Sequence, residues 1–147
     1  WPNDVLLNGG KIAGILLETI SLGAGRKALS IGVGVNLITA PNTAQIEGNA
    51  TPPVSLFSVT GVRVAPEPFL DYFASCYAVR EAEFLRNGFL PIRKAWLEHA
   101  ARIGEGIIAR LPKREIFGLF DTIDEKGHLV LKTQQGKELI ASADIFF

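Results

Sequence analysis

One stretch decides the fold of the first part of this 147-residue chain: Val5-Leu-Leu-Asn-Gly-Gly-Lys-Ile-Ala-Gly-Ile-Leu-Leu-Glu18. Two apolar runs flank the Asn-Gly-Gly segment, and an Asn-Gly pair between apolar runs is the strongest short-range signal for a β-hairpin. A second glycine-bearing turn at 21–26 precedes another β-rich run at 28–38. The sequence therefore predicts a three-stranded meander between residues 1 and 38.

The second and third strands of this meander are apolar along their whole length and show no alternation of apolar and polar residues. Such strands are typical of sheets covered on both faces, so we expect helices on one face and a ligand on the other. The next segment, 40–58, contains Pro41-Asn42, Gly48-Asn49 and Thr51-Pro52-Pro53 without a period, which predicts a loop.

Two helices are expected after this loop. The first begins at Pro66-Glu67-Pro68 and ends at Asn87-Gly88, with apolar residues at helical spacing that predict an amphipathic helix packed on the sheet. These apolar residues are Phe69, Leu70, Phe73, Tyr77, Phe84 and Leu85. The second helix is expected to start at Pro91, a favoured first helical residue, and to run towards Arg102, with Gly104 and Gly106 ending it.

The last part of the chain returns to short strands separated by turns. The expected strands are 107–111, 115–123, 128–132, 137–141 and 144–147. Such a series is typical of a small barrel of SH3-like size, which is too small to be very stable alone. We therefore predict an α+β fold of two domains. Residues 1–103 form a mixed or antiparallel sheet flanked by helices, and residues 104–147 form the SH3-like barrel.

Composition excludes several classes of protein. Fifteen Lys and Arg balance fifteen Asp and Glu, so nothing indicates binding to nucleic acid or to an anionic membrane surface. Apolar runs are too short for a membrane helix. The single cysteine, Cys76, excludes an intrachain disulfide and a Cys-based zinc site, and it favours a reducing, cytoplasmic setting. Because the chain contains no Met, we expect it to begin inside a longer gene product.

Common nucleotide motifs are absent. Leu37 stands where a dinucleotide fold needs its third glycine, and neither a Walker loop nor a G-x-S-x-G elbow occurs. His99 and His128 are interpreted as surface or packing residues. The acidic residues Asp121, Asp124 and Glu125 indicate a solvated turn rather than a metal site.

Three glycines lie inside the predicted strands: Gly14, Gly32 and Gly34. A glycine within a strand often marks close approach of another group, so glycines on adjacent strands predict a slot, with Lys11 at its mouth and Asn36 near its end. The alternative is that Lys11 protects an edge strand and that the glycines occupy bulges. The residues alone leave both interpretations open.

Three segments carry a resemblance to a known family. The segments 1–4 (W-P-N-D), 11–18 (K-I-A-G-I-L-L-E) and 32–37 (G-V-G-V-N-L) resemble the K-W-P-N-D, K-x-x-G-I-L-x-E and G-x-G-x-N motifs of the biotin protein ligases. Glu115-Ile-Phe-Gly118, Gly127, His128-Leu-Val-Leu131 and Asp144 are similar to the small C-terminal domain of that family. The resemblance implies the C-terminal part of a class II synthetase-like catalytic domain followed by the SH3-like domain.

The resemblance also implies an activity and a set of site residues. Members of the family use ATP, with Mg²⁺, to convert biotin to biotinyl-5′-adenylate, and they then transfer biotin to a lysine of a biotin carboxyl carrier domain. By resemblance, Lys11 and Asp4 are catalytic. The implied biotin-binding residues are Lys11, Gly14, Leu16, Gly32 and Val33, and the implied nucleotide-binding residues are Asn3, Lys11, Val35 and Asn36. No metal ligand is assigned.

Other functions stay open at this point. Family members carry, ahead of W-P-N-D, a loop that orders over the adenylate, so the chain read alone is also consistent with an inactive fragment or a binding module. A lipoate–protein ligase is a further alternative, and a homodimer formed through a sheet edge is left open. An aromatic residue that stacks on adenine in some members has no clear counterpart at 52–55.

Overall fold

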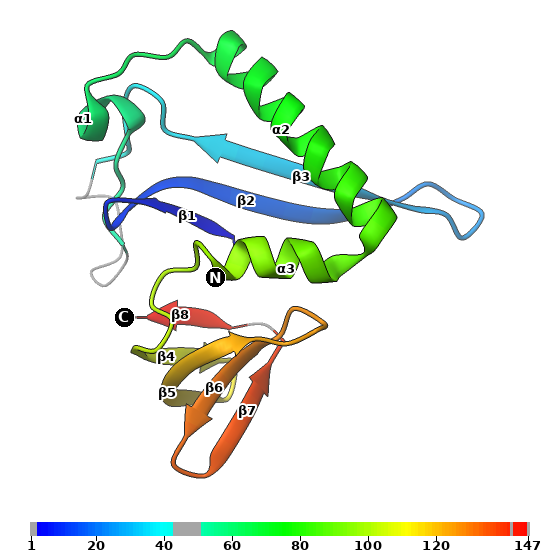
Figure 1. The fold of residues 1–147 in the computed structure, drawn as a ribbon, viewed down its shortest axis with the longest axis vertical. Helices are drawn as coiled ribbons and strands as arrows, with labels where there is room; N and C mark the ends of the chain where they lie inside the picture. The colour runs from blue at the N-terminus through cyan, green and yellow to red at the C-terminus, as the bar shows by residue number, and fades with distance from the viewer. Residues whose placement is uncertain (1–2, 43–50, 142, 147) are drawn as a thin grey trace. The chain divides into compact units, whose positions relative to one another are not determined.

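The computed structural model describes residues 3–42, 51–141 and 143–146 (Figure 1). By its internal contacts the chain divides into two units, residues 2–69 and residues 70–147. Its elements are β1 Asp4–Leu7, β2 Gly10–Ser21, β3 Lys27–Val35, α1 Leu56–Thr60, α2 Pro66–Asn87, α3 Phe89–Leu97, β4 Gly106–Leu111, β5 Arg114–Ile123, β6 Leu129–Thr133, β7 Gly136–Ile140 and β8 Asp144–Phe146. The predicted loop residues Gly48-Asn49, the motif residues Trp1-Pro2, and Ser142 lie outside the described residues.

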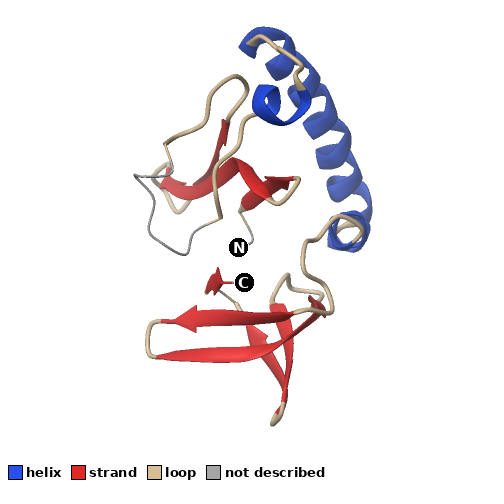
Figure 2. Cartoon of the chain, turned by 90° about the vertical axis from the view of Figure 1, so that its left-hand side faces the viewer, coloured by secondary structure: helices blue, strands red, loops and turns tan. Residues whose placement is uncertain are grey.

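The first unit contains a three-stranded antiparallel sheet in the order β1-β2-β3, which confirms the predicted meander (Figure 2). Asn8 and Gly9 both have positive φ, at 48° and 80°, as a tight hairpin turn requires. Pairing of β2 with β3 is regular along its whole length. Pairing of β1 with β2 is interrupted by a bulge that leaves Ile12 without a partner on β1.

A short segment extends the sheet beyond the end of β3. Residues 52–57, here called the strap, lie beside Lys11 of β2 and form an isolated parallel bridge there through Pro53. The last residues of the strap form the start of α1. The N-cap of this helix, Ser55, accepts a hydrogen bond from the Ser58 backbone N–H in a capping box. The predicted loop is therefore wrong in its last residues, because Ser55 starts a helix.

Apolar side chains lie on both faces of β2 and β3. Leu16 and Leu17 point to opposite faces and are 61% and 58% exposed, and Ile20, Leu29 and Ile31 are exposed as well. The strands show no alternation because both faces of this sheet are apolar, and their cover by helices and a ligand stays a prediction.

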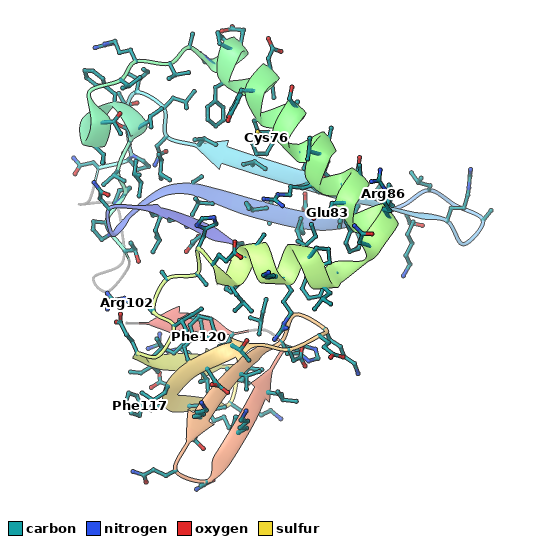
Figure 3. The ribbon with its side chains drawn as sticks, in the orientation of Figure 1. Cys76, Glu83, Arg86, Arg102, Phe117 and Phe120 are labelled. Atoms are coloured by element: carbon teal, nitrogen blue, oxygen red, sulfur yellow. The ribbon has the colours of Figure 1, made fainter. Side chains whose placement is uncertain are left out.

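The two longer helices meet at Gly88. The first, α2, has the bounds that the sequence predicts, from Pro66 to Asn87, and it buries none of its residues. Cys76 lies exposed on it (Figure 3). Its packing on the sheet stays a prediction. None of the helices in the described ranges is both long and apolar enough to cross a membrane.

Helix α3 differs from the prediction at both ends, since it begins at Phe89 rather than Pro91 and ends at Leu97 rather than near Arg102. Gly88 has a φ of 73°, which breaks the preceding helix and lets the chain start a new one at once. Pro91 is tolerated in the first turn because the first amide groups of a helix have no intrahelical acceptor.

The second unit contains all five predicted strands in one antiparallel sheet, in the order β7-β6-β5-β4-β8. No pairing joins β7 to β8 among the described residues, so the predicted closed barrel is not found and the sheet has two edges. One face buries a core made of Ile107, Ala109, Ile116, Phe120, Ile123, Leu129, Leu131 and Ile140. Phe120 belongs to this core, whereas Phe117 on the same strand is 70% exposed (Figure 3).

Helix α3 packs against this core. The Trp96 and Phe120 ring centroids lie 6.4 Å apart, and Arg93 Nε donates a hydrogen bond of 2.6 Å to the Ile123 carbonyl. The helix therefore packs on the C-terminal sheet although it precedes the predicted boundary at 103/104. That domain boundary stays a prediction.

Candidate functional site

The bulge in the first sheet turns the Lys11 side chain towards the glycines. Strict alternation along β2 would put Lys11 on the face of Ala13, opposite Gly14. The extra residue, Ile12, changes this, because a bulge re-aims the side chains next to it. A Cβ atom built on Gly14 would lie 3.8 Å from Lys11 Nζ, so the ammonium group stands over Gly14.

Asp4 completes the arrangement from the neighbouring strand. It lies opposite Gly14 in the β1·β2 pairing, and its Oδ1 is 2.5 Å from Lys11 Nζ. The side chains of Lys11 and Asp4 are 41% and 37% exposed. A pair this accessible adds at most about 1 kcal/mol to stability. It therefore orients the ammonium group while leaving it within reach of a ligand.

The strand glycines border this pair and have open space above them. Gly14 pairs directly with Gly34. The next pair on the same face of the sheet is Leu16 with Gly32. A Cβ on Gly34 would meet no atom within 4 Å, and one on Gly32 would meet nothing nearer than 3.7 Å. Internal packing therefore does not require glycine at either position, and an approaching ligand has room at both.

Both parts of the alternative interpretation of these residues are wrong. The glycines do not sit in bulges, because the β2·β3 register has no shift from Ala13 to Ser21. Lys11 does not protect an edge, because its backbone pairs with Leu6 of β1 on one side and with the strap on the other.

Two of the predicted site residues point their side chains to the other face of the sheet. Val33 pairs with Ile15 and Val35 with Ala13, so both valine side chains belong to the face opposite Gly14. Val33 can therefore line a slot with Gly14 only through its backbone, and its place in the biotin site stays a prediction. Asn3 is exposed beside Asp4, and its carbonyl accepts a hydrogen bond of 2.8 Å from the Ile15 N–H.

The Asn36 side chain faces the strap. Its Nδ2 donates to the Val54 carbonyl at 3.0 Å and reaches the Lys11 carbonyl at 3.5 Å. Gly10, Val54 and Ser55 also belong to this region, although the predicted site did not include them. A Cβ on Gly10 would overlap Val54 Cγ1 and lie 2.9 Å from Cγ2. The sequence did contain a signal for Gly10, because Asn8-Gly9 is sufficient for the hairpin turn and a second glycine therefore indicates close approach of another group.

Asp124 and His128, outside this site, lie at a turn, whereas Asp121 lies within β5 and pairs with Lys132 and Lys137. Asp124 Oδ1 accepts hydrogen bonds of 2.8 Å from the backbone N–H groups of Lys126 and His128, which confirms the solvated turn. Burial alone raises the pKa of Asp124, but these hydrogen bonds and the nearby His128 ring outweigh it and lower the pKa overall. The described residues contain no cluster of three or more His, Cys, Asp or Glu that would hold a metal ion.

Comparisons with known proteins cover the whole chain. Residues 1–36 match the model of the biotin/lipoate A/B protein ligase family, and residues 103–147 match that of the biotin protein ligase C-terminal domain. The biotin–[acetyl-CoA-carboxylase] ligase of Paracoccus denitrificans is 51% identical over 147 residues, which are 100% of this chain and 61% of that protein. The bifunctional ligase/repressor BirA of Bacillus subtilis (strain 168) is 33% identical over 99% of this chain and 44% of that protein. The chain thus spans less than two thirds of these curated relatives.

Solved structures show the same fold. The apo structure of the biotin protein ligase from Aquifex aeolicus has a TM-score of 0.82 at 22% identity, covering 99% of this chain and 62% of that one. The same ligase in complex with biotin and ATP has a TM-score of 0.79 at 23% identity, covering 99% and 60%. The chain is therefore similar to biotin protein ligases along its whole length, through the family models at its two ends, the relative that is 51% identical and the shared fold.

Proposed function

We propose that the chain carries part of the active site of an ATP-dependent biotin–protein ligase. The observation that carries this proposal is the Lys11 ammonium group, which the bulge and Asp4 hold over the bare Gly14–Gly34 pair. The reaction has two steps. Biotin and ATP give biotinyl-5′-adenylate and pyrophosphate, and the biotinyl group then passes to a lysine of a biotin carboxyl carrier domain.

Lys11 acts in the first step. A carboxylate oxygen of biotin attacks the α-phosphorus, the bond to the β-phosphate oxygen breaks, and pyrophosphate leaves. Negative charge builds on the non-bridging oxygens, and a preorganised ammonium group stabilises it more in the transition state than in the ground state. Removing one such preorganised donor lowers a rate by about 100- to 1000-fold.

Asp4 acts in the second step. The acceptor lysine has a reference pKa of about 10.4 and must lose a proton before its nitrogen attacks the carbonyl carbon of the adenylate. Asp4 orients this amine or takes its proton, and AMP leaves with its phosphate oxygen. The Asp4 carboxylate is exposed enough to meet an amine that arrives from a partner protein.

The two substrates divide the remaining residues between them. The fused rings of biotin are mostly apolar with one urea group, which suits a slot with few polar groups. Gly14, Leu16 and Gly32 line this slot on one face, and Val33 contributes only backbone groups. Asn3, Val35 and Asn36 serve the nucleotide. Mg²⁺ bound to ATP would need only one or two protein groups, because this ion keeps several of its waters.

The family match of the C-terminal segment favours biotin over lipoate as the substrate. The model that matches residues 1–36 describes biotin and lipoate ligases together, whereas the one that matches residues 103–147 describes biotin protein ligases. That second match also supports the boundary that we propose between a catalytic part at 1–103 and a C-terminal domain at 104–147.

A chimera tests the proposal, with this chain replacing the matching segment of the 51% identical Paracoccus ligase. The readouts are adenylate formation and biotin transfer to a carrier domain. We expect an active chimera in which Lys11→Ala lowers adenylate formation by about 100-fold or more. Asp4→Asn should slow transfer from preformed adenylate.

Lys27→Ala is the matched control, because Lys27 lies at the far end of β3, and it should leave the adenylation rate unchanged. Adenylation by Lys11→Ala within about threefold of the unsubstituted chimera would contradict the role of Lys11. An unchanged transfer rate in Asp4→Asn would exclude a role for Asp4 in the transfer step. Use of lipoic acid in place of biotin would exclude biotin as the substrate.

A further inference from the structure

We infer that Asn36 is a positioning residue for Lys11 and acts through the strap; this inference rests on the proposed function. Two carbonyl oxygens, those of Val54 and Lys11, lie 3.0 and 3.5 Å from Asn36 Nδ2. Carbonyl oxygens only accept hydrogen bonds, so the NH₂ end of the amide must be the end that faces them. Asn36 therefore joins the strap to the residue that carries the ammonium group.

Lys11 needs such support because β3 stops short of it. Val35, the last residue of β3, pairs with Ala13, so the backbone of Lys11 lies beyond the end of that strand. The strap takes over the pairing there. The Lys11 N–H donates to the Pro52 carbonyl at 2.8 Å, and the Val54 N–H donates to the Lys11 carbonyl at 2.9 Å. With Leu6 of β1 on its other side, the Lys11 backbone is held from both directions.

The strap is in turn fixed to the residues that follow β3. The Leu56 N–H donates to the Asn36 carbonyl at 2.8 Å, and the Phe57 N–H donates to the Leu37 carbonyl at 3.0 Å. Ser55, only 1% exposed, donates from Oγ to the Ile38 carbonyl at 2.9 Å. Asn36 thus contacts the strap with its backbone carbonyl and with its side chain, and loosening either contact frees the backbone of Lys11.

This role is separate from the nucleotide contact that we propose for Asn36, and kinetics distinguish the two. A misplaced catalytic group lowers the rate of the chemical step, whereas a lost substrate contact weakens binding of that substrate. Asn36→Asp keeps the shape of the side chain but turns a carboxylate oxygen towards two carbonyl oxygens. The variant should therefore repel the strap.

The experiment compares Asn36→Asp with the unsubstituted chimera, by amide hydrogen exchange and by steady-state kinetics. We expect the Lys11 and Val54 amides to exchange at least about tenfold faster, as for the loss of one hydrogen bond. The kcat of adenylate formation should fall by about tenfold or more. Asn87→Asp makes the same change at the exposed end of α2 and should alter none of these values.

Ser55→Ala provides an independent variant, because it loosens the strap from its other end at a residue with no proposed nucleotide contact. It should also raise Val54 exchange and lower kcat at unchanged KM. A higher KM for ATP with unchanged strap exchange in Asn36→Asp would overturn the inference, as would a lower melting temperature with unchanged kcat. An inactive unsubstituted chimera would instead overturn the proposed function, and exchange would still show whether Asn36 holds the strap.

Discussion

The two sheets of this chain differ in what they bury. Among the described residues of the first unit, Ala13 is the one buried apolar side chain, whereas the five-stranded sheet buries a continuous core. The first sheet carries Lys11, Asp4 and the open glycines, and it is organised there by backbone pairing, a bulge and the strap. The candidate chemistry and the hydrophobic core therefore lie in separate sheets.

The sharpest test of this difference is a pair of identical substitutions. Leu131 is fully buried in the second sheet and Leu16 is 61% exposed in the first. Leu131→Ala should lower the free energy of unfolding by about 2–5 kcal/mol, because it leaves a cavity. Leu16→Ala should change it by less than about 0.5 kcal/mol. Urea unfolding measures both changes. Equal losses of unfolding free energy would show that the two sheets do not differ in what they bury.

A second pair of substitutions separates packing glycines from open ones within the first sheet. Gly10→Ala forces a methyl group into Val54 and should lower the free energy of unfolding by about 1–3 kcal/mol. Gly34→Ala meets no atom within 4 Å, so stability should be kept while biotin binding by the chimera weakens. Thermal unfolding and biotin titration measure the two effects. Unchanged biotin affinity in Gly34→Ala would argue against the slot.

The smallest expected effect is a pH dependence confined to the second sheet. The pKa values of Asp121 and Asp124 are lowered, the first mainly by hydrogen bonds from Lys132 and Lys137 and the second because hydrogen bonds outweigh burial. A lowered pKa means that the folded state binds a proton less readily than the unfolded state. The ionised groups therefore stabilise the fold above their ordinary pKa near 3.8, and this stabilisation is lost as pH falls through the lowered value.

Melting curves of the whole chain between pH 2 and pH 7 measure this dependence. Asp124→Asn should lower the melting temperature at pH 7 and lose part of the decline at acidic pH, so that the two proteins converge at the lowest pH. Asp71→Asn, on an exposed turn of α2, is the control and should follow the unsubstituted curve. A constant difference at every pH would show that the Asp124 charge does not contribute.

Much of the fold was predictable because its signals are local. The Asn8-Gly9 turn, Pro66 at the start of α2 and Gly88 after its end each act within a few residues. The start of α3 was missed because Gly88 permits a second helix immediately, ahead of Pro91. Closure of the last five strands was predicted and not found, since it depends on whether β7 meets β8 and not on any local pattern.

The candidate site was predictable in its residue types but not in its geometry. Lys11 and the strand glycines predict a binding site because a cation beside glycines suits an anionic ligand. The bulge at Ile12 has no local signal, and it decides which face Lys11 occupies. Simple alternation along β3, applied from Gly32, already excludes the Val33 side chain from that face.

From the sequence alone one can place the strands, the turns and the start of α2, and its motifs indicate a likeness to biotin protein ligases, because these features depend on residues that are neighbours in the chain. Only the tertiary structure decided that Lys11 stands over Gly14, that Asn36 holds the strap and that the core lies in the second sheet. These features arise from hydrogen bonds and packing between distant residues. Pro52 and Lys11, for example, are 41 positions apart in the sequence and are joined by one backbone hydrogen bond.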